Sequence, residues 1–171
     1  KAGDDTGVAQ ALQEMRNASE KLGEVASQAY IKKNFNGATK LDANTPGNGK
    51  QGEFDQIYLH DGRLIIVEAK GGNATWGSRI DLKDKRAEQG SKSYMDKVID
   101  NYQVQLKAAE KNGSLSTGDL EKLKATVKAF EDYDGKIDYY GIKQKAKQTI
   151  DVNGEPVYGI SDSIDVVKFE L

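Results

Sequence analysis

The stretch QGEFDQIYLHDGRLIIVEAKGG, residues 51–72, decides the fold. Two runs rich in β-branched and aromatic residues, Phe54–Leu59 and Leu64–Ala69, flank the dipeptide Asp61-Gly62. This dipeptide between apolar runs is a strong signal for a two-residue type I′ turn. The stretch therefore predicts a β-hairpin.

A two-residue turn also determines which residues face one another. Counting outward from it, we expect Asp55 opposite Glu68 and Glu53 opposite Lys70. Opposed residues and alternate residues share a face of the hairpin. One face then continues from these charged residues into Ile57, Leu59, Leu64 and Ile66, and the other holds Phe54, Tyr58, Ile65, Val67 and Ala69. Because both faces are largely apolar, we expect a hairpin covered on both sides.

The charged end of the hairpin predicts a metal site. Cβ atoms of directly opposed residues lie roughly 5 Å apart, so the carboxylates of Asp55 and Glu68 repel each other when they are partly buried. A divalent cation reverses that repulsion, and Lys70 on the same face can stabilise charge on a phosphate or orient an attacking water. In the competing interpretation these are ordinary charged strand ends neutralised by nearby Lys or Arg. A register slip of one residue would separate the pair.

Composition narrows the chemistry. The chain has 171 residues, no cysteine and one histidine, which excludes disulfide scaffolds, thiolate zinc sites and multi-histidine metal sites. A metal must be held mainly by carboxylates, which favours Mg²⁺ or Mn²⁺, with Zn²⁺ as a further option. The net charge of −2 argues against a large basic footprint for bulk DNA. No apolar run reaches the roughly 18 residues of a membrane span.

The length fits a single domain, 1–171, with residues 1–7 frayed. We expect that the chain is a piece of a longer protein, because it starts with Lys1. Residues 8–30 predict an amphipathic helix in which Gly23 marks a bend or a restart. Its expected buried stripe is Val8, Leu12, Met15, Leu22, Val25 and Ala29. Residues 36–52 are rich in glycine and predict a loop with a short strand near Ala38–Leu41.

After the hairpin, residues 71–86 predict a long loop, followed by a helix over Arg86–Lys111. The apolar face of this helix is Ala87, Tyr94, Val98, Tyr102, Leu106 and Ala109. Ser116 and Asp119 resemble a capping box that opens a third helix, with the stripe Leu120, Leu123, Val127 and Phe130. The tail predicts strands over Ile137–Lys147 and Ile164–Leu171, joined by a turn at Asn153-Gly154. This order predicts an α/β or α+β class with a mixed central sheet flanked by helices.

Other residues have two interpretations each. Trp76 is placed to stack on a nucleic-acid base or to pack within its loop. Lys143, Lys145 and Lys147 alternate along one strand and either grip phosphates or solubilise an edge strand. The glycines Gly71-Gly72 suit the close approach of a phosphodiester or a plain turn.

The Asp55…Glu68-Ala69-Lys70 pattern resembles the PD-(D/E)xK signature of restriction-endonuclease-like nucleases. In that superfamily an Asp on one strand and an Asp/Glu-x-Lys on the next bind one or two divalent metals. Phe54 stands where the Pro of the family name would be, at a variable position. The resemblance implies a restriction-endonuclease-like core and a metal-dependent phosphodiesterase.

The longer string GEFDQIY…IIVEAKGG, followed by AEQGSKSY at 87–94, resembles the C-terminal nuclease domains of bacterial polymorphic toxins. These include toxins of contact-dependent growth inhibition and Rhs-type systems. The resemblance covers about residues 22–94. It implies that Glu24 adds an acidic group to the metal site and that Gln89, at the start of the second helix, faces it. Spacing alone favours a solvated helix face for Glu24, and leaves Gln89 divided between the site and the surface.

The resemblance implies an endonuclease toxin carried by a larger secreted or surface-presented bacterial protein and acting in the target-cell cytoplasm. A cognate immunity protein would neutralise it, and the Asn153-Gly154 hairpin is one place where a partner can add a strand. The acidic balance slightly favours tRNA over DNA as substrate. The alternatives are a DNA repair or recombination nuclease on the same core and a non-catalytic nucleic-acid-binding or protein-binding module. The oligomeric state is not predicted.

Overall fold

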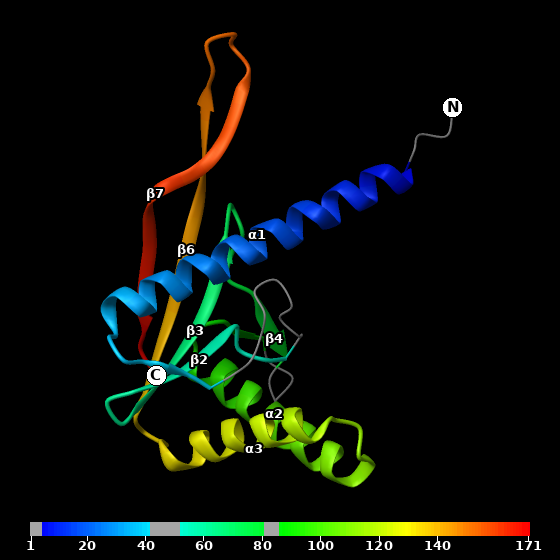
Figure 1. The fold of residues 1–171 in the computed structure, drawn as a ribbon, viewed down its shortest axis with the longest axis vertical. Coiled ribbons are helices and arrows are strands. Elements are labelled where there is room, and N and C mark those ends of the chain that lie inside the picture. The colour runs from blue at the N-terminus through cyan, green and yellow to red at the C-terminus, as the bar shows by residue number, and fades with distance from the viewer. Residues whose placement is uncertain (1–4, 42–51, 81–85) are drawn as a thin grey trace.

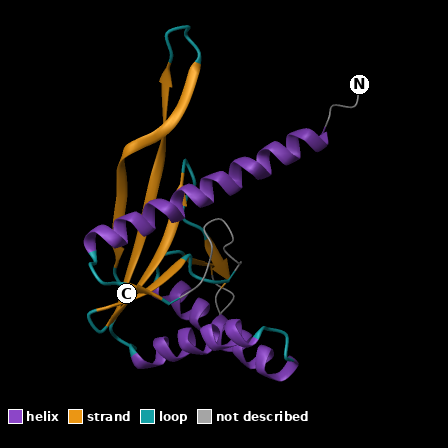
Figure 2. Cartoon of the chain, in the orientation of Figure 1, coloured by secondary structure: helices purple, strands orange, loops and turns teal. Residues whose placement is uncertain are grey.

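The computed structural model describes residues 5–41, 52–80 and 86–171, and shows an α+β fold with a mixed sheet between helices (Figures 1 and 2). The five-stranded sheet has the order β1-β2-β3-β6-β7, and β4 and β5 form a separate two-stranded sheet. Among the described strands of this sheet, β3 and β6 pair in parallel and the other neighbours pair antiparallel. In chain order the elements are α1 (Asp5–Asn34), β1 (Thr39–Lys40), β2 (Gln56–His60), β3 (Arg63–Gly71), β4 (Ser78–Ile80), β5 (Arg86–Glu88), α2 (Lys92–Asn112), α3 (Thr117–Asp132), β6 (Ile137–Ile150) and β7 (Pro156–Phe169).

The β2–β3 hairpin has the predicted turn and register. Asp61 and Gly62 have φ values of 48° and 69°, as a type I′ turn requires, and His60 lies opposite Arg63. The ladder ends at Gln56 opposite Val67, one pair short of the expected opposition of Asp55 and Glu68. The chain bends at Asp55, and this bend changes the face on which the preceding residue lies.

That residue is Phe54, and its predicted face is wrong. Phe54 is buried with Ile57, Leu64 and Ile66 rather than with Tyr58 and its neighbours. Its ring packs against the rings of Tyr102, Phe130 and Tyr139. Strand alternation holds only inside the ladder, so a residue beyond its end turns to whichever core is nearer.

Two apolar clusters cover the two faces of the sheet, so the hairpin is buried on both sides as expected. The larger cluster joins one face to α2 and α3, and its residues include Ile57, Ile66, Val98 and Phe130. The smaller one joins the other face to α1, around Ile31, Tyr58, Ile65, Val67 and Ile142. Among the described residues no helix is long and apolar enough to cross a membrane.

Helix α1 buries a different face from the predicted one. The residues that contact the sheet are Gly23, Glu24, Ser27 and Ile31, whereas the expected stripe of Val8, Leu12, Met15, Val25 and Ala29 is exposed and Leu22 is half-buried. The helix is continuous through Gly23 and already begins at Asp5, so neither a break nor fraying of residues 5–7 is present. Apolar periodicity identified the helix, but close backbone packing decided its orientation.

The region before α2 also departs from the prediction. Part of the expected loop forms β4, and Arg86–Glu88 forms β5 instead of the first turn of a helix. Helix α2 begins only at Lys92, because the Ser91 side chain accepts a hydrogen bond from the amide of Tyr94 and caps it. The predicted apolar face is correct from Tyr94 onward. Residues 81–85 of the expected loop lie outside the described part of the chain.

Helix α3 and the first strand agree with their predictions. Ser116 caps α3 by accepting from the amide of Asp119, and the predicted stripe is half-buried at Leu120 and Leu123 and buried at Val127 and Phe130. A short strand is present as β1, while residues 42–51 of the predicted glycine-rich loop lie outside the described residues.

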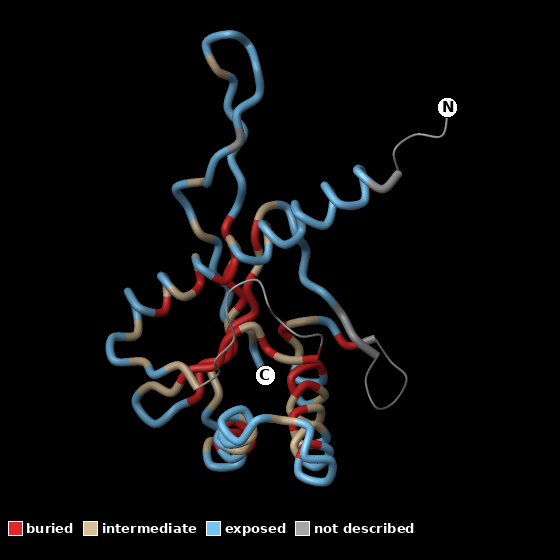
Figure 3. Tube along the Cα trace, turned by 45° about the vertical axis from the view of Figure 1, so that its right-hand side comes forward, coloured by how far each residue is buried: buried red, intermediate tan, exposed pale blue. Residues whose placement is uncertain are grey.

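The final hairpin is longer than predicted. Strands β6 and β7 each have 14 residues, and the distal half of the hairpin extends away from the body (Figure 1). Figure 3 shows that this distal half is exposed. The turn falls at Asp151–Glu155, where Asp151 accepts hydrogen bonds from the amides of Asn153 and Glu155 and Gly154 has a φ of 84°.

Candidate active site

The candidate site lies at an open edge of β3. Strand β6 pairs with β3 as far as Gly71, but β2 pairs with it only as far as Val67. Asp55, directly before β2, occupies the vacated edge: its Oδ2 accepts a hydrogen bond from the backbone amide of Ala69 at 2.7 Å. The side chain thereby replaces the missing strand and holds its carboxylate beside Glu68.

Glu68 is buried, with 1% of its surface exposed. The hydroxyl of Tyr139 donates a hydrogen bond to Oε1 at 2.9 Å, and Nε2 of Gln89 donates to Oε2 at 2.6 Å. Burial raises the pKa of Glu68 well above its ordinary value, and the Asp55 carboxylate raises it further. The Lys70 ammonium and the Tyr139 hydrogen bond act in the opposite direction but do not cancel the shift. The negative charge of this carboxylate is therefore costly unless a cation binds beside it.

Tyr139 and Gln89 hold the Glu68 carboxylate in place. Burial, followed by the charge of Glu68, raises the pKa of Tyr139, so its hydroxyl keeps the proton that it donates. Gln89 lies between β5 and α2, not on the helix as the resemblance implied. Its Oε1 accepts from the amide of Gly77 while its Nε2 donates to Glu68. The loop before β4 is thus connected to the site through one side chain.

Glu24 also reaches the pocket, and its interpretation as a solvated helix face is wrong. It is 6% exposed because α1 crosses β3 at two glycines. A Cβ on Gly23 would lie 2.5 Å from the carbonyl carbon of Lys70, and one on Gly71 would lie 1.9 Å from the carbonyl oxygen of Ser19. Only glycine permits backbones this close. What approaches Gly71 is therefore helix α1, which neither of the two interpretations of these glycines included.

The hydrogen bonds around this crossing include two residues that the sequence analysis missed. Ser19 Oγ donates to the carbonyl of Gly71 at 2.6 Å. Gln56, fully buried in β2, donates to the carbonyl of Glu24 at 2.7 Å and accepts from the hydroxyl of Tyr58. A buried amide must be paired, so a glutamine within the otherwise apolar-rich run Phe54–Leu59 was the available signal for such a contact.

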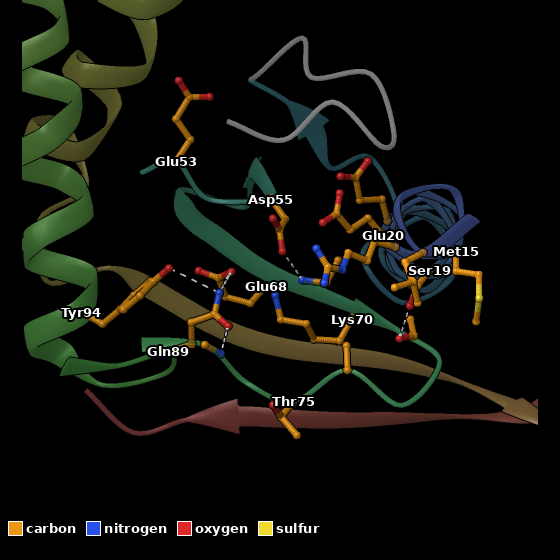
Figure 4. Close-up of a pocket in the computed structure, with 17 residues that line it drawn as sticks. Met15, Ser19, Glu20, Glu53, Asp55, Glu68, Lys70, Thr75, Gln89 and Tyr94 are labelled. Atoms are coloured by element: carbon orange, nitrogen blue, oxygen red, sulfur yellow. Dashed lines mark hydrogen bonds between the residues drawn. The ribbon is translucent and has the colours of Figure 1, made fainter. Parts of the chain in front are cut away.

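A cavity of about 730 Å³ is lined by residues that include Ser19, Glu24, Asp55, Glu68, Lys70 and Gln89. In Figure 4 Asp55, Lys70 and Gln89 point toward Glu68, whereas Glu53 points away. Among the described residues the lining includes two cationic side chains, Arg16 and Lys70, and five carboxylates, Glu20, Glu24, Glu53, Asp55 and Glu68. The excess of carboxylates makes the cavity attractive to cations and repulsive to an isolated phosphate.

The complete metal-ligand set implied by the resemblance is not assembled. Within the described parts of the chain no three Asp, Glu, His or Cys side chains lie together closely enough to hold a metal ion. Asp55 and Glu68 are close enough for one to shift the pKa of the other, and Glu24 lines the same cavity without completing a group of three. The arrangement is a carboxylate pair.

The other residues with a predicted nucleic-acid-binding role have different surroundings in the structure. Lys143 is half-buried and lies beside Lys70 in the parallel β3–β6 ladder. Lys145 forms an ion pair with Asp165 at 2.6 Å, and Lys147 is exposed farther along the hairpin. Trp76 is 36% exposed, but its ring packs edge-on against Phe169 and lies over Gly141. The contacts of Trp76 are those of a packed loop residue.

No protein-family model matches the chain, and no significant similarity to a curated protein or to a solved structure was found.

Proposed function

We propose that this chain is a metal-dependent endonuclease with a restriction-endonuclease-like core. One observation carries the proposal. A buried glutamate with a raised pKa, Glu68, faces Asp55 and Lys70 in a cavity at the open end of a sheet edge. Ordinary strand-end charges are solvated. Here Glu68 is instead held by two hydrogen bonds in an environment that disfavours its ionised form, which is typical of functional sites.

The residues present fit a hard divalent cation. Mg²⁺ and Mn²⁺ are commonly held by one or two carboxylates, with water and substrate phosphate filling the remaining positions, and Asp55 and Glu68 offer such a pair. The absence of a third carboxylate in the group is compatible with that mode of binding. When bound, the cation would lower the pKa of a water molecule and neutralise charge on the phosphate. It would also offset the acidic lining that otherwise repels a nucleic acid.

The chain's own residues would position the reaction. The amide of Ala69 orients Asp55, and Tyr139 and Gln89 orient Glu68, so both carboxylates are fixed before substrate arrives. Water attacks phosphorus and gives up a proton to solvent, one P–O ester bond breaks, and the departing oxygen takes up a proton from solvent. The Lys70 ammonium stabilises the negative charge that develops on the phosphoryl oxygens.

The substrate we propose is a nucleic acid, with tRNA slightly favoured over DNA. Lys143 on β6 lies beside Lys70 and adds a second positive charge there, and Lys147 is four residues farther along β6. Such contacts hold the sugar-phosphate backbone without reading sequence. The short basic track and the net charge of −2 suit a compact, shaped RNA better than extensive binding to a duplex.

The biological setting we propose is that of a toxin domain acting in a target bacterium, with a cognate immunity protein. Strand β7 is at one edge of the five-stranded sheet. The distal part of the β6–β7 hairpin exposes apolar side chains: Ile150 on β6, Val152 in the turn and Ile160 on β7. An exposed strand edge with apolar side chains suits strand addition by a protein partner. These features support an inhibitor that docks on the hairpin.

A cleavage assay tests the activity. Supercoiled plasmid and total tRNA are incubated with the purified chain in Mg²⁺, Mn²⁺, Zn²⁺ or EDTA. Glu68→Gln and Lys70→Met are tested alongside Glu121→Gln and Lys128→Met, which alter the same residue types on the exposed side of α3. We expect metal-dependent cleavage by the wild type and by both α3 variants, and none by the two site variants.

Two outcomes would count against the proposal. Failure to cleave either substrate in any metal would contradict the nuclease assignment, and would leave a non-catalytic binding module. Cleavage that persists in EDTA and in both site variants would retain a nuclease but place its active site elsewhere.

A further inference from the structure

Helix α1 has an apolar face that points away from the sheet, and of its residues only Met15 also borders the cavity. Seven residues recur at alternating spacings of three and four along its length, and all are exposed except the half-buried Leu22: Val8, Ala11, Met15, Ala18, Leu22, Val25 and Ala29. At 3.6 residues per turn, this row lies on the opposite side of the helix from Gly23, Glu24, Ser27 and Ile31, which contact the sheet. The spacing is that of a heptad repeat, the seam of a coiled coil. We call these seven residues the α1 seam.

The N-terminal half of α1 lacks a packing layer. It projects from the body of the molecule (Figure 1), and residues 7–18 are all exposed (Figure 3). Val8 and Met15 have 61% and 69% of their surface exposed. Helices of such length gain most of their stability from the packing of an apolar face, so the α1 seam is suited to a second helix.

We propose that the α1 seam is the interface of an antiparallel coiled-coil dimer between two copies of this chain. When the two helices cross between residues 16 and 17, six of the seven seam positions meet one another in pairs, and Ala29 lies beyond the last pair. Ala11 lies opposite Leu22 of the second copy, and Met15 lies opposite Ala18. Val8 lies opposite Val25, and this pair forms the outermost layer at each end of the interface. Two of the three kinds of layer then place a small side chain against a large one, which fills the interface evenly.

Charge supports the same alignment. Glu14 and Lys21 immediately precede the seam residues Met15 and Leu22 on one edge. In antiparallel helices these edge positions meet each other, so Glu14 pairs with Lys21 of the second copy, and symmetry repeats the pair. In a parallel dimer Glu14 would face Ser19, and Lys21 would face Ala26. The layers would then pair Ala11 and Ala18 with themselves, leaving gaps without any charge pair. The antiparallel form therefore satisfies both packing and electrostatics.

Disulfide trapping tests the alignment, because the natural chain has no cysteine. Val8→Cys mixed with Val25→Cys should form a disulfide-linked dimer under mild oxidation, since these positions share a layer. Neither variant alone should do so, because two copies of the same position lie about 25 Å apart along the axis at 1.5 Å per residue. A disulfide formed by Val8→Cys alone would indicate a parallel pair and contradict the proposal.

Sedimentation equilibrium tests the association itself. We expect the wild type to dimerise, and Met15→Glu, at an exposed position, to raise the dissociation constant by at least about 100-fold. Glu14→Lys and Lys21→Glu should each raise it by about tenfold, and mixing these two variants should restore dimers. Glu110→Lys on α2 is the control and should leave the constant unchanged, with circular dichroism confirming that every variant is folded. A wild type that remains monomeric at about 0.5 mM would overturn the proposal and leave the α1 seam for a helix of a different protein.

Discussion

Two hairpins of this protein have similar sequence signals and opposite environments. Asp61-Gly62 closes β2–β3, and Asn153-Gly154 lies in the turn of β6–β7. The first hairpin is covered on both faces, so that Ile57, Leu64 and Ile66 have no exposed surface. The distal part of the second is exposed, with Val152 fully accessible and Ile160 at 61%. Turn chemistry shapes both hairpins but does not determine what covers them.

The difference in coverage explains why carboxylates on the two hairpins have different surroundings. Asp162 and Glu155 on the exposed hairpin remain solvated. Glu68, on β3, is buried beside Asp55 and is hydrogen-bonded by Tyr139 of β6 and by Gln89 from the segment between β5 and α2. Burial alone is enough to raise the pKa of a carboxyl group, so the covering elements, rather than the strand, create the site.

The largest expected difference between the two hairpins is in catalytic activity when an aspartate near each one is substituted. Asp55→Asn keeps an oxygen that can accept from the amide of Ala69 but removes the charge beside Glu68. We expect kcat/KM to fall by about 10³-fold, or roughly 4 kcal/mol, whereas Asp162→Asn on β7 should change it by less than about threefold. Steady-state cleavage of the substrate found active would measure both. Near-normal activity of Asp55→Asn would show that the carboxylate pair is not the reactive centre.

The next largest difference between the two hairpins is in the free energy of unfolding that is lost when an isoleucine on each is truncated. Ile66→Ala removes three carbons from a fully buried position and should lower the free energy of unfolding by about 2–5 kcal/mol. Ile160→Ala, on the exposed part of β7, should change it by about 0.5 kcal/mol or less. Urea unfolding followed by circular dichroism measures both. Equal losses of unfolding free energy in the two variants would mean that the distal hairpin is buried in solution, for example in a contact between two copies of the chain.

A smaller effect tests the close contact between α1 and the first hairpin. Gly23→Ala places a methyl group against the backbone of Lys70 and Gly71, so it should destabilise the fold by about 1–3 kcal/mol despite the better helix propensity of alanine. Gly159→Ala, with nothing within 4 Å of the added carbon, should be close to neutral. Thermal unfolding of the two variants provides the comparison. A stabilised Gly23→Ala protein would contradict the crossing at Gly23.

The smallest effect concerns Asp138, which connects the two hairpins by pairing with Arg63 on β3 and Lys168 on β7. The hydrogen bond from Arg63, with a further one from Lys168, lowers the pKa of Asp138 from 3.8 to about 2, against the opposing effect of burial. A depressed pKa stabilises the fold above the unfolded value, and this stabilisation is lost as the pH falls from about 4 to 2.

Asp138→Asn should therefore cost about 1 kcal/mol at pH 7, because both partners are about half exposed and screened by solvent. The difference between variant and wild type should shrink below pH 4. Urea unfolding at pH 7, 4 and 2.5 would show it. A difference that is independent of pH would mean that packing, rather than charge, is lost.

Several elements were predictable because their signals are local. The Asp61-Gly62 turn sets its own register, and Ser116 with Asp119 caps α3 without help from the rest of the chain. The mixed sheet between helices followed from the order of these elements. The candidate trio of Asp55, Glu68 and Lys70 was found in the same way, since its members are separated by a single turn.

Other features were not predictable because they depend on how separate elements pair and pack. The buried face of α1 was missed because apolar periodicity marked the exposed side, while glycine contacts with β3 placed Glu24 inside. Gln89 was assigned to a helix that starts only at Lys92, since β4 pairing converts Arg86–Glu88 into a strand. Phe54 left its expected face because the ladder ended at Gln56.

The sequence by itself determined the hairpin, its register and the residues at its charged end, because turn geometry and strand alternation act over a few residues. Only the tertiary structure decided that β2 stops short of Glu68, that Asp55 takes the vacant hydrogen-bonding position, and that α1 brings Glu24 to the same cavity. The first two depend on how the chain bends at the end of the ladder, with Asp55 and Ala69 14 residues apart, and the third on backbones that meet across about fifty residues; in all three, packing and desolvation act and local propensity does not.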